Sequence, residues 1–551
     1  MNSPTPSHLL VCPQQLAAEV GQTIFEAGGN AADAAVAVAF AQGVVDPFMT
    51  SIGGTSTALI WDAGRRDLYT LNCGAAAGSV PPPDSWLRNA RETLETVGRF
   101  GIEGNENQFG YKSIMVPGVV RGAQELYERL GSGAIAWSDL LKPAIKLADE
   151  GFTVRPMLAE CWGGGDEPRG TGGLGSPSFD EKLAATPGAT ATFLKDGKEP
   201  YQVGDRLVFK DLASTMRTLA VEGPQSFYTG SVGQAMIDDF RRGGALINAQ
   251  DVREYQAKIR RPLSTTYRGY TVYTNPPPAR GVPMLAMLDI VEGWDPAALE
   301  WNSPRYIDRL TAAMRCAFRD YADHGDDPDF ADVPIEQIVS KDRAAAWRAA
   351  IEAGRGDAPL DGTGLPPGTT HITATDADGN IVLWTHSIGS IAGSGVVSPG
   401  LGFLYNNFLG FFDPRPDRPR SLVPGKRTAG GASTLVFDGD RPVLALGSPG
   451  GSRIVSSVFQ VVMNVLDHGM PMQDALSVPR FHSEEAGLLF IEPAFPEETS
   501  QALQGLGYRA ERSTYMAKIQ ALHIDPSTGQ PSPGADPRAE GGVAAWQSDR
   551  A

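Results

Sequence analysis

The chain has 551 residues, of which 42% are hydrophobic and 20% charged, and its formal net charge is −17 at pH 7. This composition is typical of a soluble globular protein with ample core, and the acidic charge argues against nucleic acid or an anionic membrane as a partner. Length alone suggests about three or four domains.

The cysteines and the N-terminus bear on location. The four cysteines form no CxxC pair, which argues against a zinc site or a disulfide framework and indicates buried thiols in a reducing compartment: Cys12, Cys73, Cys161 and Cys316. The first residues, MNSPTPSHLLVCPQQ, show no secretory signal. The most apolar region, Ala31–Val45, is shorter than a membrane span and is interrupted by Asp33 and Gln42. We therefore expect a cytoplasmic protein.

The N-terminal part of the chain is predicted to contain both helices and strands. Helical spacing over Gln14–Ala27 ends at a Gly-Gly pair, and Asn30 is a good N-cap for an alanine-rich helix over Ala31–Gln42. Further along the chain the pattern predicts two strands and then two helices: Thr55–Trp61, Leu68–Asn72, Val120–Leu130 and Trp137–Glu150.

The middle of the chain contains two loops of interest. Residues 162–178 are glycine-rich and indicate a mobile surface loop, with a lid over a pocket as the alternative. Later, the acidic run His324–Asp329 indicates a solvated loop, since a metal site would need more convergent ligands. Between them we expect a strand and two helices: Tyr270–Thr274, Met284–Val291 and Ser303–Ala322.

A predicted hairpin follows a segment rich in proline and glycine. The segment Asp361–Gly368 holds two prolines and three glycines, which predict a loop. Two alternating apolar runs, Thr370–Ala374 and Ile381–Trp384, flank the turn residues DGN and predict a β-hairpin. A loop would thus deliver Thr369 to the first position of a buried strand.

Thr369 in that position suggests a nucleophile. If the Gly368–Thr369 bond were cut, Thr369 would carry a hydroxyl and a free α-amine on one residue. An α-amine titrates near pH ~8, so it can take the hydroxyl proton itself and no histidine is needed. The alternative is an ordinary strand start occupied by β-branched residues.

A second hairpin leads into a glycine loop. Strands over Ser433–Phe437 and Pro442–Leu446 precede the sequence GSPGGS at 447–452, and an amphipathic helix, Arg453–Leu466, follows it. Such a strand–loop–helix arrangement directs free backbone N–H groups toward one point. A phosphate site and an oxyanion site both fit, although the Walker pattern is missing.

Several motifs together resemble the γ-glutamyltransferases, which are autoprocessed threonine members of the N-terminal-nucleophile hydrolases. In chain order they are EAGGNAADAAVA, PPPARG, DDPDF, TTHITATDADGN, GSPGGSR, PRFH and ADPRAEGG. The resemblance runs from about Val20 to Ala544. It implies an α+β fold, a four-layer αββα sandwich forming a single domain over 1–551. It also implies cleavage into a large subunit, 1–368, and a small catalytic subunit, 369–551, which stay together as a heterodimer.

The resemblance also assigns catalytic positions. Thr369 aligns with the family's catalytic threonine, and Ser387 stands where the family has a second threonine that hydrogen-bonds the nucleophile. Gly450 and Gly451 match the glycine pair whose backbone amides bind the oxyanion. No cofactor and no metal is implied.

The substrate-recognition positions depart from the family. The family holds the α-carboxylate and α-amine of a γ-glutamyl group with charged, amide and hydroxyl side chains, and here these positions carry glycine or phenylalanine: Gly74, Gly389, Phe408, Phe411, Gly430 and Gly431. A buried charge without partners costs several kcal/mol, so a plain γ-glutamyl group is expected to bind poorly.

Nearby residues suggest how the pocket is rebuilt. Five aromatic residues lie close to the nucleophile in sequence and form either an enlarged apolar acyl pocket or ordinary core: Trp384, Tyr405, Phe408, Phe411 and Phe412. Three arginines offer an alternative anion site, although two of them lie in stretches that the family shares: Arg280, Arg427 and Arg453.

The sequence therefore predicts a threonine amidohydrolase or acyltransferase that cleaves an amide through an acyl-enzyme on Thr369, with non-standard acyl specificity and with water or an amine as acceptor. The alternative enzyme is a true glutathione hydrolase, or γ-glutamyl transpeptidase. The alternative from another class is an inactive binding protein on the same fold, which the retention of Thr369, Ser387, Gly450 and Gly451 disfavours.

Overall fold

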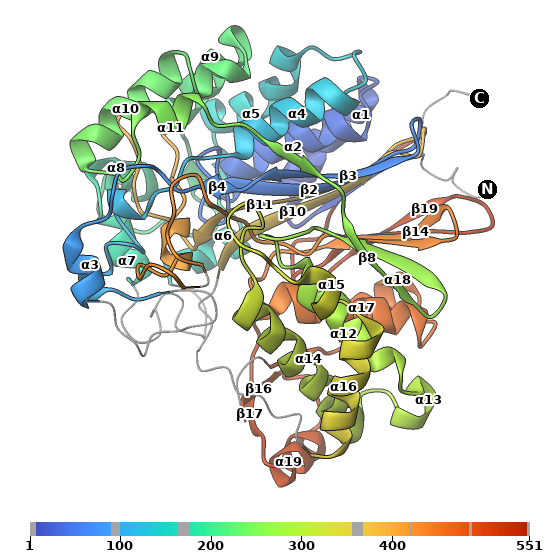
Figure 1. Cartoon of the computed structure of the whole chain (residues 1–551). Coiled ribbons are helices and arrows are strands. Elements are labelled where there is room, and N and C mark those ends of the chain that lie inside the picture. Colours follow the sequence, from blue (N-terminus) through green and yellow to red (C-terminus); the bar gives the residue numbers. More distant parts are fainter. Residues whose placement is uncertain are drawn as a thin grey trace.

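Two β-sheets face each other in the centre of the protein (Figure 1). The computed structural model describes residues 7–89, 100–163, 177–354, 367–418, 420–483 and 488–547. The seven-stranded sheet has the order β20-β1-β10-β11-β2-β3-β7, and its strands are Gly542–Trp546, His8–Cys12, Pro367–Thr375, Ile381–Ser390, Thr55–Asp62, Asp67–Cys73 and Lys258–Arg260. The six-stranded sheet has the order β19-β18-β14-β13-β9-β8, and its strands are Pro531–Ala535, Gln520–Ile524, Arg441–Gly447, Thr434–Asp438, Tyr270–Thr274 and Leu263–Tyr267.

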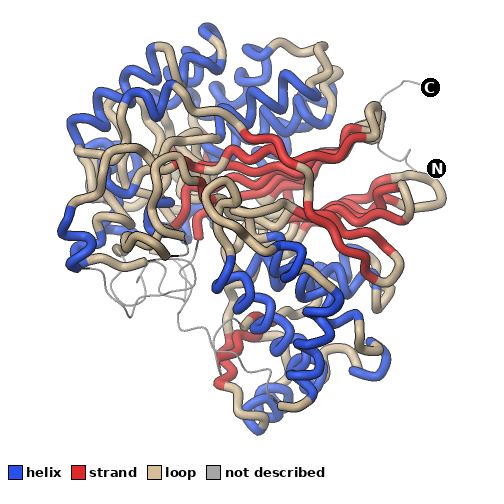
Figure 2. The backbone as a smooth tube through the Cα atoms, in the orientation of Figure 1, coloured by secondary structure: helices blue, strands red, loops and turns tan. Residues whose placement is uncertain are grey.

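Helices cover the outer face of each sheet (Figures 1 and 2). The helices on the seven-stranded sheet include α1 Gln15–Glu26, α2 Ala31–Val45, α4 Val119–Leu130, α5 Trp137–Glu150 and α9 Lys210–Glu222. Those on the six-stranded sheet include α12 Gly281–Glu292, α14 Pro304–His324, α16 Lys341–Glu352, α17 Arg453–Leu466 and α18 Met472–Ser477. The chain thus forms the predicted αββα sandwich.

Smaller elements complete the layers. The remaining helices include α3 Asp84–Asn89, α6 Pro156–Ala159, α7 Phe179–Leu183, α8 Pro187–Phe193, α10 Ser231–Gly243, α11 Ala249–Arg253, α13 Pro296–Leu299, α15 Ile335–Ile338 and α19 Glu497–Gly505. The remaining strands include β4 Ala75–Ala76, β5 Phe152–Thr153, β6 Arg206–Leu207, β12 Arg427–Thr428, β15 Phe481–His482, β16 Leu488–Ile491 and β17 Arg509–Arg512. Of these, β4 and β12 pair with each other close to the candidate site.

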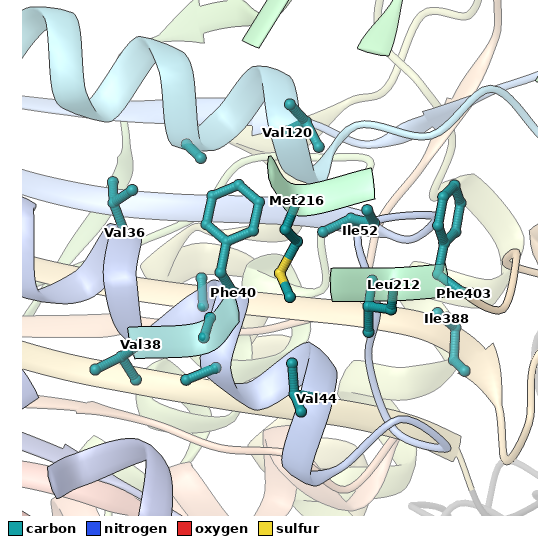
Figure 3. Close-up of a cluster of buried hydrophobic side chains, with 14 of the residues drawn as sticks. Val36, Val38, Phe40, Val44, Ile52, Val120, Leu212, Met216, Ile388 and Phe403 are labelled. Atoms are coloured by element: carbon teal, nitrogen blue, oxygen red, sulfur yellow. The ribbon is translucent and has the colours of Figure 1, made fainter. Parts of the chain in front are cut away.

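Three apolar layers hold the sandwich together. Between the sheets, a compact cluster includes Leu9, Leu59, Leu383 and Leu435. Outside the seven-stranded sheet lies a larger cluster, part of which Figure 3 shows around Phe40 and Met216. Every residue of α2 is buried there, because its alanines let the helix pack closely on all sides. The third cluster lies between the six-stranded sheet and α12, α14 and α17.

Many predicted elements occur with the expected bounds. The bounds of α5, α17 and β9 are those expected from the sequence. Asn30 caps α2 by accepting hydrogen bonds of 3.0 Å from the backbone N–H groups of Ala32 and Asp33, as its position suggested. Helix α2 then continues to Val45, three residues beyond the predicted end. Within the described ranges, none of the helices combines the length and apolar character needed to cross a bilayer.

The start of strand β10 differs from the prediction. Strand β10 begins at Pro367, so Thr369 is its third residue rather than its first. Pro367 pairs with Ser390 and Gly368 with Gly389, and a register shift separates Gly368 from Thr369. A proline is tolerated as the first residue of a strand because only its missing N–H is lost from the ladder. Residues 361–366 of the predicted loop, and 164–176 of the glycine-rich segment, lie outside the described residues.

Candidate active site

Thr369 and Ser387 lie opposite each other on β10 and β11. Both side chains are buried, and the Thr369 hydroxyl donates a hydrogen bond of 3.1 Å to Ser387 Oγ. The Ser387 hydroxyl in turn donates to the carbonyl oxygen of Gly368, the residue just before Thr369. Ser387 Oγ also accepts 3.0 Å from the backbone N–H of Gly389. One serine hydroxyl thus links the threonine hydroxyl to the carbonyl of the Gly368–Thr369 peptide bond.

The glycine loop at 447–452 connects β14 to α17, as the sequence predicted. Gly450 has φ +140°, a conformation that side chains other than glycine's rarely adopt. A Cβ at this position would also lie 2.7 Å from Ala517 Cα. The Pro449 carbonyl accepts 3.2 Å from Lys518 N–H. The loop therefore rests directly on the backbone of residues 517–518, which fixes its path.

A buried ion pair holds this supporting segment in place. Arg480 and Asp536 are both fully buried, and their side chains approach to 2.6 Å. Arg480 also donates 2.8 Å to the Ala517 carbonyl, and Asp536 accepts 2.9 Å from Ile519 N–H. The neighbouring arginine guanidinium groups hold the pKa of Asp536 below its usual value despite the opposing effect of burial. These contacts anchor both sides of residue 518, on which Pro449 rests.

At two of the predicted recognition positions, Gly74 and Gly389, neighbouring atoms occupy the place of a side chain. A Cβ at Gly74 would lie 2.8 Å from Asn72 Oδ1 and 2.9 Å from the Thr428 carbonyl oxygen. A Cβ at Gly389, whose φ is +101°, would lie 2.2 Å from Asn407 Oδ1. The loss of a side chain therefore does not by itself open space at these two positions.

The other pair of glycines differs from the first. No atom outside Gly430's chain neighbours lies within 4 Å of a Cβ built there, so this position faces open space. A Cβ at Gly431 would lie 3.1 Å from Thr385 Oγ1. The Gly430 carbonyl accepts 3.1 Å from the Thr57 hydroxyl, which joins this segment to β2. A small side chain could therefore be accommodated at Gly430.

The five aromatic residues divide into two groups. Trp384 and Tyr405 belong to the large core under the helices, where the interpretation as ordinary core is right. Phe408 and Phe412 are buried in a separate small cluster, with Phe411 packed against it. The Phe408 and Phe411 rings are stacked with centroids 5.2 Å apart. Because Ala75, next to Gly74, belongs to the same cluster, an apolar wall lies beside the recognition positions.

Two of the three candidate arginines are engaged in structure. Arg427 donates to the carbonyls of Asn72 and Gln256 and lies over the Tyr255 ring. Arg453 donates to the Tyr515 carbonyl and lies over its ring. The backbone N–H of Arg280 donates 3.0 Å to the Gly431 carbonyl, so its main chain borders the open position.

The acidic run His324–Asp329 is not the solvated loop that was expected. Lys426 and Asp326 form a buried ion pair of 2.7 Å, and Asp327 accepts 2.9 Å from Arg427 N–H. The sequence did not show that these carboxylates face a Lys-Arg pair that lies 100 residues further along the chain. They clamp the strand that leads to Gly430. Among the described residues no group of histidines, cysteines and carboxylates is arranged to hold a metal ion.

Sequence reasoning missed one residue of this region altogether. His371, two positions after Thr369, is fully buried, and its ring lies against Gly447 at the start of the glycine loop. The alternation of side chains along a strand was the signal available, because it places residues 369 and 371 on the same face.

Comparison with known proteins shows the family of the chain. The family model for Gamma-glutamyltranspeptidase matches residues 17–546. The chain belongs to the gamma-glutamyltranspeptidase family. It is thus an amidohydrolase or acyltransferase of that family, and the alternative of an inactive binding protein is not supported.

The relatives of this chain include proteins named acylases and proteins named glutathione hydrolases. The Acylase ACY 1 proenzyme of Pseudomonas sp. (strain V22) is 35% identical over 529 residues, covering 94% of this chain and 90% of the relative. The Glutathione hydrolase proenzyme of Bacillus subtilis (strain 168) is 29% identical over 537 residues, covering 93% and 87%. The crystal structure of cephalosporin acylase from Bacillus halodurans superposes with a TM-score of 0.86 at 28% identity, covering 100% of this chain and 98% of the other.

Proposed function

We propose that this protein is an autoprocessing acylase whose nucleophile is Thr369 and whose substrates are amides with acyl groups that lack the α-amino-acid head of glutamate. The observation that carries the proposal is the pair of hydrogen bonds from Thr369 to Ser387 and from Ser387 to the Gly368 carbonyl. The description of two relatives as proenzymes supports cleavage of the chain.

Maturation would use the same groups. The Ser387 hydroxyl polarises the Gly368 carbonyl, and Thr369 Oγ attacks its carbon while the hydroxyl proton passes to the departing Thr369 nitrogen. The peptide bond is thereby replaced by an ester between Gly368 and Thr369 Oγ. Water then hydrolyses the ester and leaves a carboxylate on Gly368 and a free α-amine on Thr369, so that chains 1–368 and 369–551 remain together as a heterodimer.

Turnover follows the same chemistry with an external amide. The α-amine accepts the hydroxyl proton of Thr369 as Oγ attacks the substrate carbonyl, and it returns the proton to the leaving nitrogen. The backbone amides of Gly450 and Gly451 stabilise the oxyanion. Water then attacks the acyl-enzyme, its proton passing to the same amine and from there to the departing Thr369 Oγ, and the carboxylic acid leaves. An amine in place of water gives acyl transfer.

The acyl preference rests on the recognition positions. Gly74 and Gly389 offer no side chain and no space for one, and Phe408 and Phe411 present an apolar wall. A carboxylate and an ammonium would each lose water there without gaining a charged partner. The acylase names of two similar proteins support this, and the acyl side chains of cephalosporins are a suitable first substrate class. A true glutathione hydrolase remains the second candidate, since relatives with that name are also similar along most of the chain.

The test is the covalent state of the purified protein. Intact mass and N-terminal sequencing should show two chains, the smaller starting at Thr369, and Thr369→Ala should remain one chain. Ser387→Ala should mature slowly, and Ser387→Thr, which restores the hydroxyl, should mature at a rate close to the wild type. A wild-type chain that stays uncut and still hydrolyses amides would refute the proposal.

A further inference from the structure

The imidazole of His371 lies between the two sheets, at the point where β14 ends and the glycine loop begins. A Cβ built on Gly447 would be 2.2 Å from His371 Cε1 and 2.3 Å from Nε2, and its three nearest atoms all belong to this ring. Gly447 does not have a positive φ, so its backbone would accept alanine if the ring were absent. The ring is therefore the obstacle at this position.

The hydrogen bonds of His371 fix its tautomer. The Thr373 hydroxyl donates 2.9 Å to the Gln520 carbonyl, so its oxygen is left as acceptor for His371 Nε2–H at 3.1 Å. Nδ1 of the neutral ring is then an acceptor, and the Thr385 hydroxyl donates to it at 2.8 Å. Burial lowers the pKa of His371 to about 3, which agrees with a neutral ring at neutral pH.

This set of contacts joins the two halves of the candidate site. His371 and Thr373 belong to β10, the strand of Thr369, whereas Gln520 belongs to β18 of the other sheet. Gln520 pairs with Gly447 in the ladder between β18 and β14. The imidazole is thus linked through the Thr373 hydroxyl to Gln520, the residue that pairs with Gly447, and its ring also lies directly against Gly447.

We propose that His371 is a positioning residue that sets the distance between the nucleophile strand and the oxyanion loop. Its ring acts as a spacer against Gly447, while its two hydrogen bonds hold the ring in one orientation. It takes no proton in the reaction, since both ring nitrogens are already engaged. The inference rests on the proposed roles of Thr369 and of the loop at 447–452. It adds the residue that aligns the nucleophile with this loop.

A double-mutant cycle tests the spacer. Gly447→Ala alone should push the loop away from the ring and lower kcat by about 10²-fold, the scale of one lost oxyanion donor, with KM changed by less than about threefold. His371→Ala alone should also lower kcat. In the double variant, kcat should be at least about tenfold higher than the value obtained by multiplying the wild-type kcat by the two single-variant ratios. The reason is that the methyl group introduced by Gly447→Ala has space once the imidazole is removed.

A second buried histidine supplies the matched control. His386 is fully buried in the adjacent strand, and its Nδ1 lies 2.9 Å from Thr50 Oγ1 on the opposite face of the sheet. His386→Ala should lower thermal stability about as much as His371→Ala but leave kcat within about twofold. His371→Gln, which keeps a donor for Thr373, should recover part of the kcat lost in His371→Ala.

The outcomes separate this inference from the proposed function. Strictly multiplicative effects in the cycle, wild-type kcat in Gly447→Ala, or an equal kcat loss in His386→Ala would overturn the spacer. If His371→Ala does not fold, Gly447→Ala with His371→Gln still tests it through the same comparison. The proposed function fails instead if Thr369→Ala is processed, whatever the cycle shows.

Discussion

The most informative perturbation is to remove two charged groups from the substrate. The γ-glutamyl anilide carries an α-carboxylate and an α-amine, and the butanoyl anilide is the same acyl chain without them. Comparing the two isolates the contribution of the recognition positions, because the scissile amide and the leaving group are identical.

The expected magnitude follows from the residues at the predicted recognition positions. Gly74 and Gly389 present no side-chain donor or acceptor, and the Phe408 and Phe411 rings carry no charge. If two charge-assisted hydrogen bonds of about 1.5–3 kcal/mol each are missing, the γ-glutamyl group loses about 3–6 kcal/mol. This corresponds to a factor of roughly 10²–10⁴ in affinity. We therefore expect the butanoyl anilide to have the higher kcat/KM.

The assay is anilide release by the mature protein under identical conditions. Gly430→Ser serves as a control variant, since a side chain there meets open space and should leave folding intact. Gly389→Ser should fold poorly, because a Cβ would lie 2.2 Å from Asn407 Oδ1. A γ-glutamyl anilide preferred by tenfold or more would refute the reasoning about these positions and favour the glutathione hydrolase.

Three further outcomes are expected. Gly450→Ala, whose Cβ would lie 2.7 Å from Ala517 Cα, should lower kcat by about 10²-fold with little change in KM, and normal steady-state turnover would exclude the loop from the mechanism. Asp326→Ala leaves the buried Lys426 ammonium without its carboxylate partner and should lower the free energy of unfolding, measured by urea titration, by about 3–5 kcal/mol. A loss below about 1 kcal/mol would show that the ion pair is solvated. Burial lowers the pKa of His386 from 6.5 to about 3, so on acidification the unfolded chain binds a proton before the folded chain does, and the free energy of unfolding falls as the pH drops below 6.5. His386→Phe should reduce this loss by up to about 1.4 kcal/mol per pH unit. If the free energy of unfolding of the variant fell with acid as steeply as that of the wild type, a buried neutral ring would be contradicted.

The elements that the sequence predicted best are those with a local physical cause. Helix α2 begins where Asn30 caps it, and α5 and α17 end where their apolar spacing ends. Strand β10 was harder, because prolines and glycines signal a loop locally, while pairing with Ser390 and Gly389 extends the strand to Pro367. That pairing is a tertiary contact, which local propensity does not contain.

The candidate site likewise combines features that the local sequence reveals with features that depend on tertiary contacts. Its residues could be named from motifs, but the surroundings of its glycines could not. Glycine in a sequence suggests added space, whereas Asn407 occupies that space at Gly389 and nothing does at Gly430. The clamp between Asp326 and Lys426, like the contact of His371 with Gly447, joins segments far apart in the chain. Such contacts depend on how the sheets stack, which a periodic pattern does not specify.

The central claim, that Thr369 carries the acyl group, can be tested by trapping the intermediate. The mature protein is mixed with a reactive acyl anilide, quenched in acid during turnover, digested and analysed by mass spectrometry. The account predicts one added acyl mass on the peptide whose first residue is Thr369, and none in a Thr369→Ala variant, which lacks the hydroxyl. An acyl mass on any other residue, or full turnover with a small subunit that does not begin at Thr369, would contradict it.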